Sequence, residues 1–321
     1  MCNSAKIMNI SLLNFHKTVT VHAPGTVANL VCGFDILGLC LQQPFDVMEV
    51  RLLQEKKVTI ISGDGFALPT NPALNTAGAP LIEMLKSINE NIGFEVTIHK
   101  HIKPGSGIGS SAASAAGAVV GANQLLGNIF SKPALVQFAM HGEKVASGVM
   151  HADNIAPCIY GGITLIRSNE PLDIIVIPSP ALFVTIVHPQ IEVKTADARQ
   201  ILKKEISMKK AIAQWGNVAG LIAGFFSNDT ALIGRSLHDN IVEPVRSILI
   251  PHFHEVKEKC LAAGAIGGGI SGSGPSIFML SKNETIAQNV ASAMKEVYDK
   301  TKLDYHIYVS AISKTGVEII E

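Results

Sequence analysis

A glycine-rich segment near the middle of the chain has the composition of an anion-binding loop. Residues 103–121 read KPGSGIGSSAASAAGAVVG and contain five glycines, four serines and five alanines. After the glycines at 105, 107 and 109, a run of small residues that starts at Ser110 suits a closely packed helix. A glycine loop that enters a helix presents unpaired backbone N–H groups at the positive end of the helix dipole, where anions such as phosphate bind.

Two familiar phosphate-binding patterns do not describe this segment. A Walker A loop ends in Gly-Lys-Ser/Thr, and no lysine follows these glycines. The dinucleotide fingerprint is GxGxxG, whereas the third glycine here is followed directly by Ser110. Taken alone, the segment fits either another class of phosphate loop or a glycine-serine turn before an ordinary small-residue helix.

Histidine and cysteine supply no second centre of chemistry. The eleven histidines include the pairs His99/His101 and His252/His254. The first pair alternates along a predicted strand, as a metal site could use, but no HExxH pattern and no nearby acidic or cysteine partner supports it. The five cysteines are scattered and never form CxxC. They indicate reduced thiols in a cytosolic protein, not a disulfide framework or a zinc site.

Composition narrows the class of protein further. Hydrophobic residues make up 47% of the 321 residues, and 26 basic residues balance 26 acidic ones, so no large field attracts nucleic acid or acidic membranes. The most apolar stretch, DIIVIPSPALFVTIV, is broken by Pro178 and Pro180 and predicts two strands around a turn. The N-terminus lacks the hydrophobic core of a signal peptide. We expect a cytoplasmic protein with neither a nucleic-acid nor a membrane partner.

Strands and helices alternate irregularly around the glycine loop. Residues 93–102 predict a strand that runs into the loop, residues 75–89 and 131–147 predict helices, and residues 45–53 and 57–63 predict a pair of strands. Residues 156–168 predict a strand with a glycine kink. Later strands are expected at 173–178, 182–188, 264–270, 276–281 and 304–311, with helices around 195–226, after 251 and at 284–299. This mixture favours an α+β fold over a doubly wound sheet.

Three motifs together resemble those of the GHMP kinases, a family that includes galactokinase, homoserine kinase and mevalonate kinase. They are APGTVANLVCGFDILGLCL (23–41), PGSGIGSSAAS (104–114) and GGGISGSGPSIFML (267–280), in the family's order and spacing. Within the family, the chain resembles the homoserine kinases most. That resemblance rests on the pattern from Pro24 to Gly38 and on MHADNIAPCIYGG (150–162), VKTADAR (193–199) and IVEPVRSILIP (241–251). The sequence departs from relatives at Val31-Cys32, where Gly-Pro or similar small residues are usual.

The resemblance implies a fold of two domains, which the length of the chain also favours. It implies an N-terminal ATP-binding domain of the ribosomal-S5-domain-2-like kind, which we place at 18–170. A ferredoxin-like C-terminal domain would occupy 171–321. ATP and the acceptor would meet in the cleft between the two domains.

The resemblance also assigns the ATP and Mg²⁺ sites. Backbone N–H groups of the glycine loop would surround the triphosphate, Asn75 would contact the adenine, and Ser111 with Glu143 would hold Mg²⁺. An ion that keeps several waters and takes few protein oxygens is well served by such a pair. The ATP-binding residues implied are Asn75, Pro104, Gly105, Ser106, Gly107, Ile108, Gly109, Ser110 and Ser111.

The acceptor implied is L-homoserine, a zwitterion whose side-chain hydroxyl receives the phosphoryl group. By resemblance, Arg199 and Arg246 bind its carboxylate, and arginine suits a planar bidentate partner better than lysine. Asp35 and Asn29 would hold the amino end and the hydroxyl. Taken singly, each arginine fits a surface ion pair, and it is the motif around each that favours the substrate role.

Two further residues would lie at the reacting oxygen. Asn154 is carried over beside it, and Thr195 would orient the hydroxyl. Mevalonate kinase-like relatives have an aspartate near the position of Asn154 that can act as a base. An amide cannot, so we hypothesise that transfer proceeds without a dedicated protein base. His151 and Asp153 are interpreted as residues that shape the turn and not as acid–base groups.

The sequence leaves two alternative functions open. One is a GHMP kinase for another small alcohol, such as mevalonate or shikimate. The other is a non-catalytic ligand sensor, which the intact glycines and the presence of both Ser111 and Glu143 disfavour. Relatives are often dimers, so a homodimer is one option. The resemblance also implies a step in threonine biosynthesis.

Overall fold

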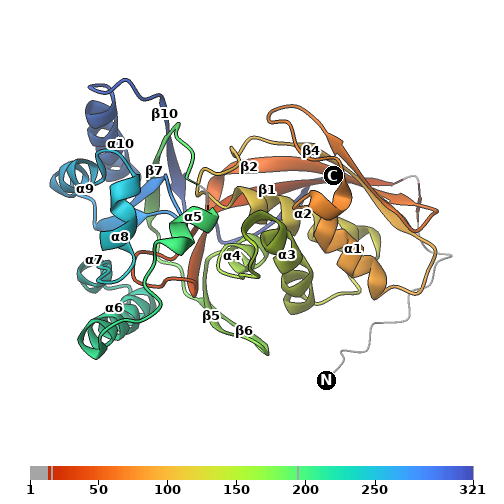
Figure 1. Cartoon of the computed structure of the whole chain (residues 1–321), viewed down its shortest axis with the longest axis horizontal. Helices are drawn as coiled ribbons and strands as arrows, with labels where there is room; N and C mark the ends of the chain where they lie inside the picture. The colour runs from red at the N-terminus through yellow and green to blue at the C-terminus, as the bar shows by residue number, and fades with distance from the viewer. Residues whose placement is uncertain (1–13, 16, 194, 321) are drawn as a thin grey trace.

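The computed structural model describes residues 14, 15, 17–193 and 195–320, and for residues 195 and 196 it describes the backbone alone. The chain forms two lobes, each built on its own sheet (Figure 1). Among the described residues, no helix is both long and apolar enough to cross a membrane.

The larger sheet forms the first lobe and has seven strands in the described chain. Its order is β11-β1-β2-β4-β3, and β5 joins β2 while β6 joins β5. Neighbouring strands are antiparallel except for β3 and β4, which are parallel. The strands are β1 (Thr18–Ala28), β2 (Leu37–Leu53), β3 (Val58–Ser62), β4 (Gly93–His99), β5 (Ile163–Asn169), β6 (Leu172–Ile177) and β11 (Glu318–Ile320).

The predicted pairing of residues 45–53 with 57–63 is wrong. Strand β4 lies between β2 and β3, and it pairs with both of them. The chain passes from β3 through helix α1 (Gly78–Lys86) before it enters β4. Such a helical crossover makes its two strands parallel neighbours, so adjacency in sequence did not produce a hairpin here.

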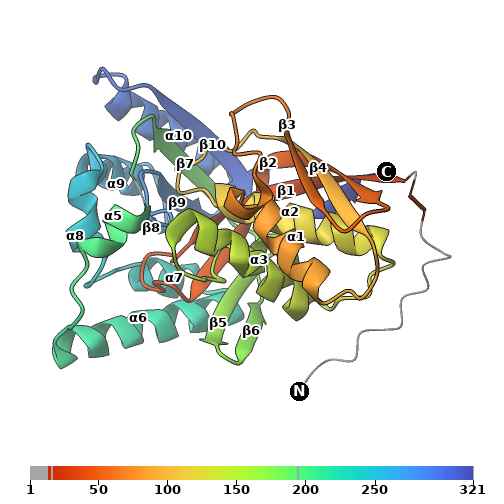
Figure 2. The ribbon, with the colours of Figure 1, turned by 45° about the vertical axis from the view of Figure 1, so that its right-hand side comes forward.

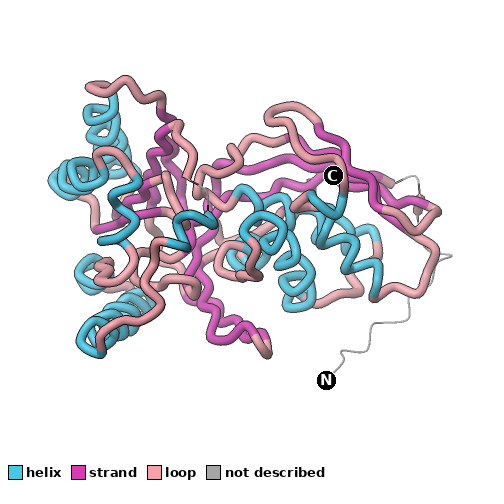
Figure 3. Tube along the Cα trace, in the orientation of Figure 1, coloured by secondary structure: helices cyan, strands magenta, loops and turns pink. Residues whose placement is uncertain are grey.

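Helices cover one face of the larger sheet, as Figure 3 shows. Helix α2 (Ser110–Leu125) lies at the centre of this layer, between β1 and β2 on one side and the other helices on the other. Thirteen of its sixteen residues are buried, and almost all of these are small, because the helix has neighbours on every side. The other elements of this layer are η2 (Pro72–Leu74), α1, α3 (Lys132–Ser147) and α4 (Ile155–Tyr160).

The strand predicted for residues 156–168 begins later than expected. Residues 156–160 belong to α4, and β5 starts only at Ile163. Between them, Gly161 and Gly162 have φ angles of 79° and 64°, in the left-handed region that favours glycine. The glycine pair therefore separates a helix from a strand and does not kink one strand.

The second lobe has a four-stranded antiparallel sheet in the order β10-β7-β9-β8. Helices separate β7 from β8 and β9 from β10, so the lobe has the ferredoxin-like arrangement that was predicted. Its strands are β7 (Phe183–Pro189), β8 (Gly267–Ile270), β9 (Ile277–Ser281) and β10 (Tyr305–Ala311). Its helices are α5 (Thr195–Gln200), α6 (Met208–Ser227), α7 (Thr230–Ser236), α8 (Glu243–Arg246), η3 (Ser247–Leu249), α9 (Phe253–Ala262) and α10 (Glu284–Tyr298).

The predicted domain boundary at residues 170–171 lies in the turn between β5 and β6. Both strands belong to the larger sheet, and β11 at the end of the chain returns to that sheet beside β1. The change from one sheet to the other therefore comes between β6 and β7. The division into domains at residue 170 stays a prediction.

Close helix packing positions the side chains that follow. A Cβ atom added to Gly142 of α3 would lie 2.4 Å from the carbonyl oxygen of Thr76 and 2.7 Å from Cβ of Ala115 in α2. The glycine thus lets α3 approach α2 closely. The next residue along α3 is Glu143, which reaches the start of α2 because of this approach.

We expect Gly142→Ala to lower the free energy of unfolding by about 1–3 kcal/mol, because the added methyl overlaps its neighbours. Gly216→Ala in α6 is the matched control, since no neighbouring atom lies within 4 Å of a Cβ added there. This second change should raise the free energy of unfolding by roughly 0.5–1 kcal/mol, because alanine is the better helix former. Urea unfolding followed by circular dichroism measures both. Equal stabilisation of the two variants would contradict the packing described.

Candidate active site

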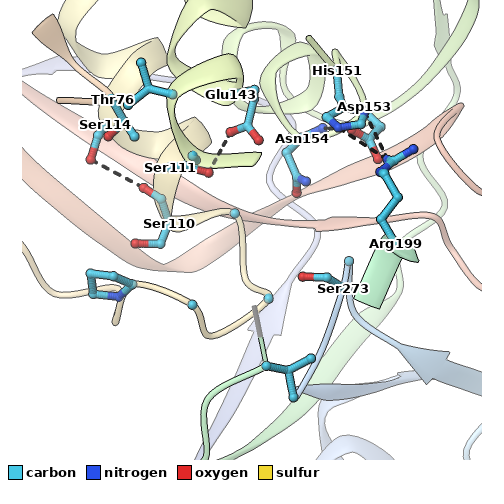
Figure 4. Close-up of a pocket in the computed structure, with 18 of the residues that line it drawn as sticks. Thr76, Ser110, Ser111, Ser114, Glu143, His151, Asp153, Asn154, Arg199 and Ser273 are labelled. Carbon is cyan, nitrogen blue, oxygen red and sulfur yellow. Dashed lines mark hydrogen bonds between the residues drawn. The ribbon is translucent and has the colours of Figure 1, made fainter. Parts of the chain in front are cut away.

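A cleft of about 520 Å³ lies between the two lobes. The first lobe contributes the loop before β2, the glycine loop with the start of α2, and parts of α3 and of the turn before α4. The second lobe contributes residues 192–193, Arg199, Arg246 and residues 272–273. Figure 4 shows that Ser111 and Glu143 point toward each other on one side, with Asn154, His151 and Arg199 beyond them.

The glycine loop, residues 104–109, ends at an uncapped helix. Gly105, Gly107 and Gly109 have φ angles of 75°, 80° and 67°, which side chains would strain. Helix α2 begins at Ser110, and no side chain caps its N-terminus. The first N–H groups of α2 are therefore left for a ligand in the cleft, and the helix dipole favours a negatively charged one.

The glycine segment of the second lobe supports the glycine loop from behind. Ser271 Oγ donates to the carbonyl of Gly107, and Ser276 Oγ donates to the carbonyl of Ser106, both at 2.7 Å. A Cβ atom at Gly107 would lie 2.6 Å from the carbonyl oxygen of Ser271. The two segments, more than 160 residues apart in sequence, are thus in direct contact.

Lys100, which follows β4, ties together the two ends of the glycine loop. Its ammonium group contacts the carboxylate of Asp46 and donates to Ser110 O at 2.6 Å and to Ser114 Oγ at 2.9 Å. Asp46 also accepts the backbone N–H groups of the two residues after Lys100, each at 2.8 Å. Burial lowers the pKa of Lys100, and the carboxylate of Asp46 opposes that shift.

Ser111 and Glu143 form a pair of oxygen ligands beside the glycine loop. Ser111 Oγ donates to Glu143 Oε1 at 2.6 Å, and Glu143 is buried. Burial raises the pKa of Glu143, while the hydrogen bond from Ser111 lowers it. No lysine or arginine of the described chain forms an ion pair with this carboxylate. A hard divalent cation fits such a hydroxyl–carboxylate pair.

Asn154 is held in one orientation by the first motif. Its Oδ1 accepts a hydrogen bond from Thr26 Oγ1 at 2.7 Å. Thr26 also lies close behind the glycine loop, because its N–H donates to Ile108 O at 3.2 Å. With the carbonyl end occupied, the amide can offer its Nδ2 group to a ligand in the cleft.

The loop between β1 and β2 has an unusual backbone. Asn29, Leu30, Val31 and Asp35 all have positive φ angles, of 73°, 40°, 66° and 61°. For non-glycine residues, each such conformation costs on the order of 1–3 kcal/mol. Asn29 holds the loop, since its Oδ1 accepts the N–H of Asp35 at 3.0 Å and its Nδ2 donates to Gly272 O at 2.8 Å. Asp35 thereby lines the cleft.

Arg199 faces Asp35 across the cleft. Its two Nη atoms donate to the two carboxylate oxygens of Asp35 at 2.9 Å and 2.8 Å, and Nη2 lies 3.3 Å from both ring nitrogens of His151. The Nε–H group of Arg199 is buried and has no hydrogen-bond partner in the described chain. A carboxylate is the natural acceptor for such a group.

Arg246 lies beside Arg199, and the ring of Phe34 lies 5.0 Å from its guanidinium and 5.4 Å from that of Arg199. Its Nε donates to Ala198 O at 2.8 Å, and the side chain is buried. No carboxylate of the described chain forms an ion pair with Arg246. Burial, followed by repulsion from Arg199, lowers its pKa to about 10. Two guanidinium groups lie at this end of the cleft, and only that of Arg199 is paired with a carboxylate, so the positive charge left over favours an anion.

Asp153 is a buried carboxyl group in the same cleft. It is 5% exposed, and its Oδ1 accepts the N–H of Asn154 at 3.1 Å. Burial raises its pKa to about 7, and the negative charges of Asp35 and Glu143 add to the shift. The group is therefore poised to change its charge near neutral pH.

Known proteins resemble the chain along almost its whole length. Models of the GHMP kinases N-terminal domain and the GHMP kinases C-terminal domain match residues 77–162 and 221–300. A homoserine kinase of Chlorobium phaeobacteroides is 47% identical over 319 residues, which cover 95% of this chain and 100% of that protein. A homoserine kinase of Methanococcus vannielii is 42% identical over 286 residues, which cover 88% of this chain and 94% of that one.

The chain belongs to the GHMP kinases. The crystal structure of homoserine kinase from Cytophaga hutchinsonii covers 97% of this chain and 100% of its own, with 47% identity and a TM-score of 0.91. A mevalonate kinase of L. major in complex with R-mevalonate has a TM-score of 0.70 at 14% identity, which shows a shared fold alone. The predicted α+β fold of the GHMP kinases is confirmed.

Most of the residues assigned by resemblance to this GHMP kinase's sites line the one cleft. Ser106 and Ile108 do not line it: both are buried, and Ser106 Oγ accepts the N–H of Ile108 at 3.3 Å. Thr195 begins α5, but its side chain lies outside the described residues, so its role stays a prediction. Those that line the cleft are Asn29, Asp35, Asn75, Pro104, Gly105, Gly107, Gly109, Ser110, Ser111, Glu143, Asn154, Arg199 and Arg246.

Asn75 uses its amide within its own loop. Its Nδ2 donates to Pro69 O at 2.7 Å, and its Oδ1 accepts the N–H of Ala77 at 2.8 Å. The side chain is 2% exposed, although the residue lines the cleft. These bonds shape the loop before α1, and the adenine contact expected of Asn75 stays a prediction.

The sequence did not identify several residues that line the cleft of this GHMP kinase. Lys100, Phe34, His151 and Asp153 all line it, although the last two had been assigned to shaping a turn. For Asp153 the signal is burial, which sequence does not display. His151 could have been found from its position three residues before Asn154, within the same motif.

We expect Asp153→Asn to raise the free energy of unfolding at pH 8. A carboxyl whose pKa is raised to about 7 in the folded protein binds more protons folded than unfolded, so the wild type loses stability as pH rises from about 4 to 7. The difference between the variant and the wild type should therefore grow over that range and level off above it, at up to about 4 kcal/mol. Chemical unfolding at several pH values measures it. A difference that is constant with pH would contradict the raised pKa.

Proposed function

We propose that the protein transfers the γ-phosphoryl group of ATP to the side-chain hydroxyl of L-homoserine, which yields O-phospho-L-homoserine. One observation carries the proposal: a single cleft is lined both by the uncapped start of α2 and by Arg199, Arg246 and Asp35. The start of α2 can bind phosphate. The two arginines complement the carboxylate of an amino acid, and Asp35 complements its ammonium group. The homoserine kinases at 47% and 42% identity support the same reaction.

ATP would place its triphosphate against the glycine loop. The free N–H groups at the start of α2 would bind phosphate oxygens, and Ser271 and Ser276 would keep the loop from moving back. Lys100 keeps the start of α2 close to the end of β4. Phosphoryl transfer depends mainly on such positioning and on charge stabilisation.

Mg²⁺ is the ion that Ser111 and Glu143 would hold. The fit rests on the buried carboxylate of Glu143, which has a hydroxyl but no cation beside it in the described chain. The ion would neutralise negative charge on the phosphate oxygens. The two side chains would position it between the glycine loop and Asn154.

Homoserine would bind through both of its charges. The unpartnered Nε–H of Arg199 and the guanidinium of Arg246 would take its carboxylate. Asp35, with Asp153 close by, would take its ammonium group. Mevalonate and shikimate carry a carboxylate but no ammonium group, so Asp35 would keep Arg199 as its only cation and would gain none from the ligand. The cleft therefore favours homoserine over those alcohols.

The transfer itself would be direct. The hydroxyl oxygen of homoserine attacks the γ-phosphorus, and the bond from that phosphorus to the bridging oxygen of ADP breaks. Asn154, held by Thr26, would orient the hydroxyl through Nδ2. The proton would leave through phosphate or water without a dedicated protein base.

The cellular setting follows from this reaction. The product is an activated amino acid on the route to threonine, and we place the protein in the cytoplasm. Its described cysteines Cys32, Cys40, Cys158 and Cys260 are unpaired, as expected in a reducing compartment. We also propose a homodimer.

The direct experiment is an assay of ADP release with Mg-ATP and a panel of acceptors, with the product identified by mass spectrometry. The panel contains L-homoserine, mevalonate, shikimate, galactose and L-serine. The proposal predicts turnover with homoserine and a phosphorylated product of the same carbon skeleton. Turnover on another member alone would overturn the substrate, and no turnover by protein that still binds ATP would support a ligand sensor.

We expect Arg246→Ala to raise KM for homoserine by about 100-fold while KM for ATP changes little, because a charge-assisted contact to the carboxylate is worth about 1.5–3 kcal/mol. Arg235→Ala is the matched control, since Arg235 is exposed on α7 and does not line the cleft. Steady-state kinetics of both variants measure the effect. Equal changes in the two KM values, or an equal effect of Arg235→Ala, would contradict the carboxylate site.

The absence of a protein base predicts the behaviour of two further variants. Asn154→Asp should not raise kcat, and Asp153→Asn should keep kcat within about tenfold of the wild type, because general-base catalysis contributes about 10²–10⁴-fold where it operates. The pH dependence of kcat is the measurement. A loss of about a thousandfold in Asp153→Asn, with the limb near pH 7 abolished, would instead identify Asp153 as the base.

A further inference from the structure

The loop between β1 and β2 belongs to the first lobe but is attached to the second. Figure 2 shows the loop, in red, reaching toward α6 and α7. The buried Gln214 of α6 donates from Nε2 to Cys32 O at 2.8 Å, and Asn29 Nδ2 donates to Gly272 O, also at 2.8 Å. The second lobe therefore holds this loop on both sides of Val31.

Val31 has a backbone conformation that its side chain disfavours. Its φ angle is 66°, in the left-handed region, where a β-branched residue is rarely found. The side chain is nevertheless only 5% exposed. A glycine at this position would adopt the same φ angle without strain. Contacts that the valine side chain makes outside the loop therefore offset the strain in its backbone.

The side chain of Val31 packs against β8 of the second lobe. A Cβ atom added to Gly269 would lie 3.2 Å from Cγ2 of Val31, so this methyl group contacts the strand where the strand has no side chain. Val242 and Ile270, also of the second lobe, line with Val31 a cavity of about 10 Å³. Such a volume holds at most one water molecule, so the valine fills most of the space between the loop and β8.

We infer that Val31 is a positioning residue, which holds the loop against β8 and thereby keeps Asp35 in place for the ammonium group of the substrate. The identity of that substrate rests on the function proposed above. Hydrogen bonds through Asn29 connect the two residues. Asn29 O accepts the N–H of Gly33 at 2.7 Å, and Asn29 Oδ1 accepts the N–H of Asp35 at 3.0 Å. Because the loop is ordered before the ligand binds, less binding free energy is lost in ordering it.

The change Val31→Gly would remove the strain and the contact with β8 together. Glycine has more backbone conformations available, so the loop would hold Asp35 at the cleft in a smaller fraction of the molecules. The apparent affinity for a ligand that needs this carboxylate falls in proportion to that fraction. The strained residue thus favours binding of the substrate at a cost to the stability of the loop.

Amide hydrogen exchange and steady-state kinetics of Val31→Gly test the inference. Without ligand, the amides of residues 29–37 should exchange at least about 10-fold faster than in the wild type. KM for L-homoserine should rise by at least about 10-fold, while kcat and KM for ATP change by less than about threefold. Asn228→Gly is the matched control and should change none of these, since Asn228 also has a positive φ angle, 54°, but is exposed at the end of α6 and away from the cleft.

A ligand without an ammonium group separates the positioning of Asp35 from a general loosening of the cleft. The inhibition constant of 4-hydroxybutyrate against homoserine should stay within about threefold of the wild type in Val31→Gly. Val31→Ala removes the contact with β8 but restricts the backbone more than glycine does, so it should show the same changes to a smaller extent.

Equal weakening of homoserine and 4-hydroxybutyrate would overturn the inference. Unchanged amide exchange in residues 29–37 would also overturn it, as would faster exchange with an unchanged KM for homoserine. A wild type that does not phosphorylate homoserine would contradict the proposed function instead. In that case, unchanged exchange in Val31→Gly would still overturn the role of Val31, and faster exchange would support its hold on the loop.

Discussion

The chemistry of the cleft depends on buried charged groups that have no partner of opposite charge in the fold. Arg246 is buried beside a second guanidinium, and their shared ring, Phe34, gives both cations a partial partner only. Glu143 and Asp153 are buried carboxyl groups without a lysine or arginine partner in the described chain. Burying charge without a partner is costly, so a protein keeps such groups where ligands supply the opposite charge. These unmatched groups support the proposed ligands, an amino-acid carboxylate at the arginines and a divalent cation at Glu143.

The rest of the fold holds these charges at fixed separations. Glycines allow α3 to approach α2 and allow the two glycine segments to touch, so that side chains from both lobes reach the same space. The strained loop from Asn29 to Asp35 is tied to the second lobe through Gly272. A backbone in such a conformation persists only when its surroundings enforce it. Strain, close glycine contacts and unmatched charge therefore occur together at the site, as expected of a functional cleft.

Local sequence patterns alone predicted several of these elements. The glycine spacing predicted the loop at the start of α2, and the pattern of residues 93–102 predicted β4. Two failures have physical causes. The pairing of β2 with β3 depends on the crossover through α1, which is a property of the whole sheet. Residues 156–160 lack a helical period long enough to read, since α4 has only six residues.

The site was predictable to the extent that motifs marked it. Three motifs identified residues that the fold then brought into one cleft, although each motif alone had an ordinary interpretation. The burial of a side chain cannot be deduced from its position in these motifs. The raised pKa of Asp153 and the contacts of Lys100 were therefore not predicted. Nor does sequence reveal that Arg199 pairs with Asp35, 164 residues away, in the absence of a ligand.

The proposed reaction requires the cleft to select a substrate that carries both charges of an amino acid. The most direct measurement compares kcat/KM for L-homoserine with that for 4-hydroxybutyrate, which lacks the ammonium group, and for 3-aminopropan-1-ol, which lacks the carboxylate. We expect each loss to lower kcat/KM by at least about 100-fold, because each removes a charge-assisted contact, to Arg246 and Arg199 in one case and to Asp35 in the other. Turnover of either analogue at a rate close to that of homoserine would contradict it.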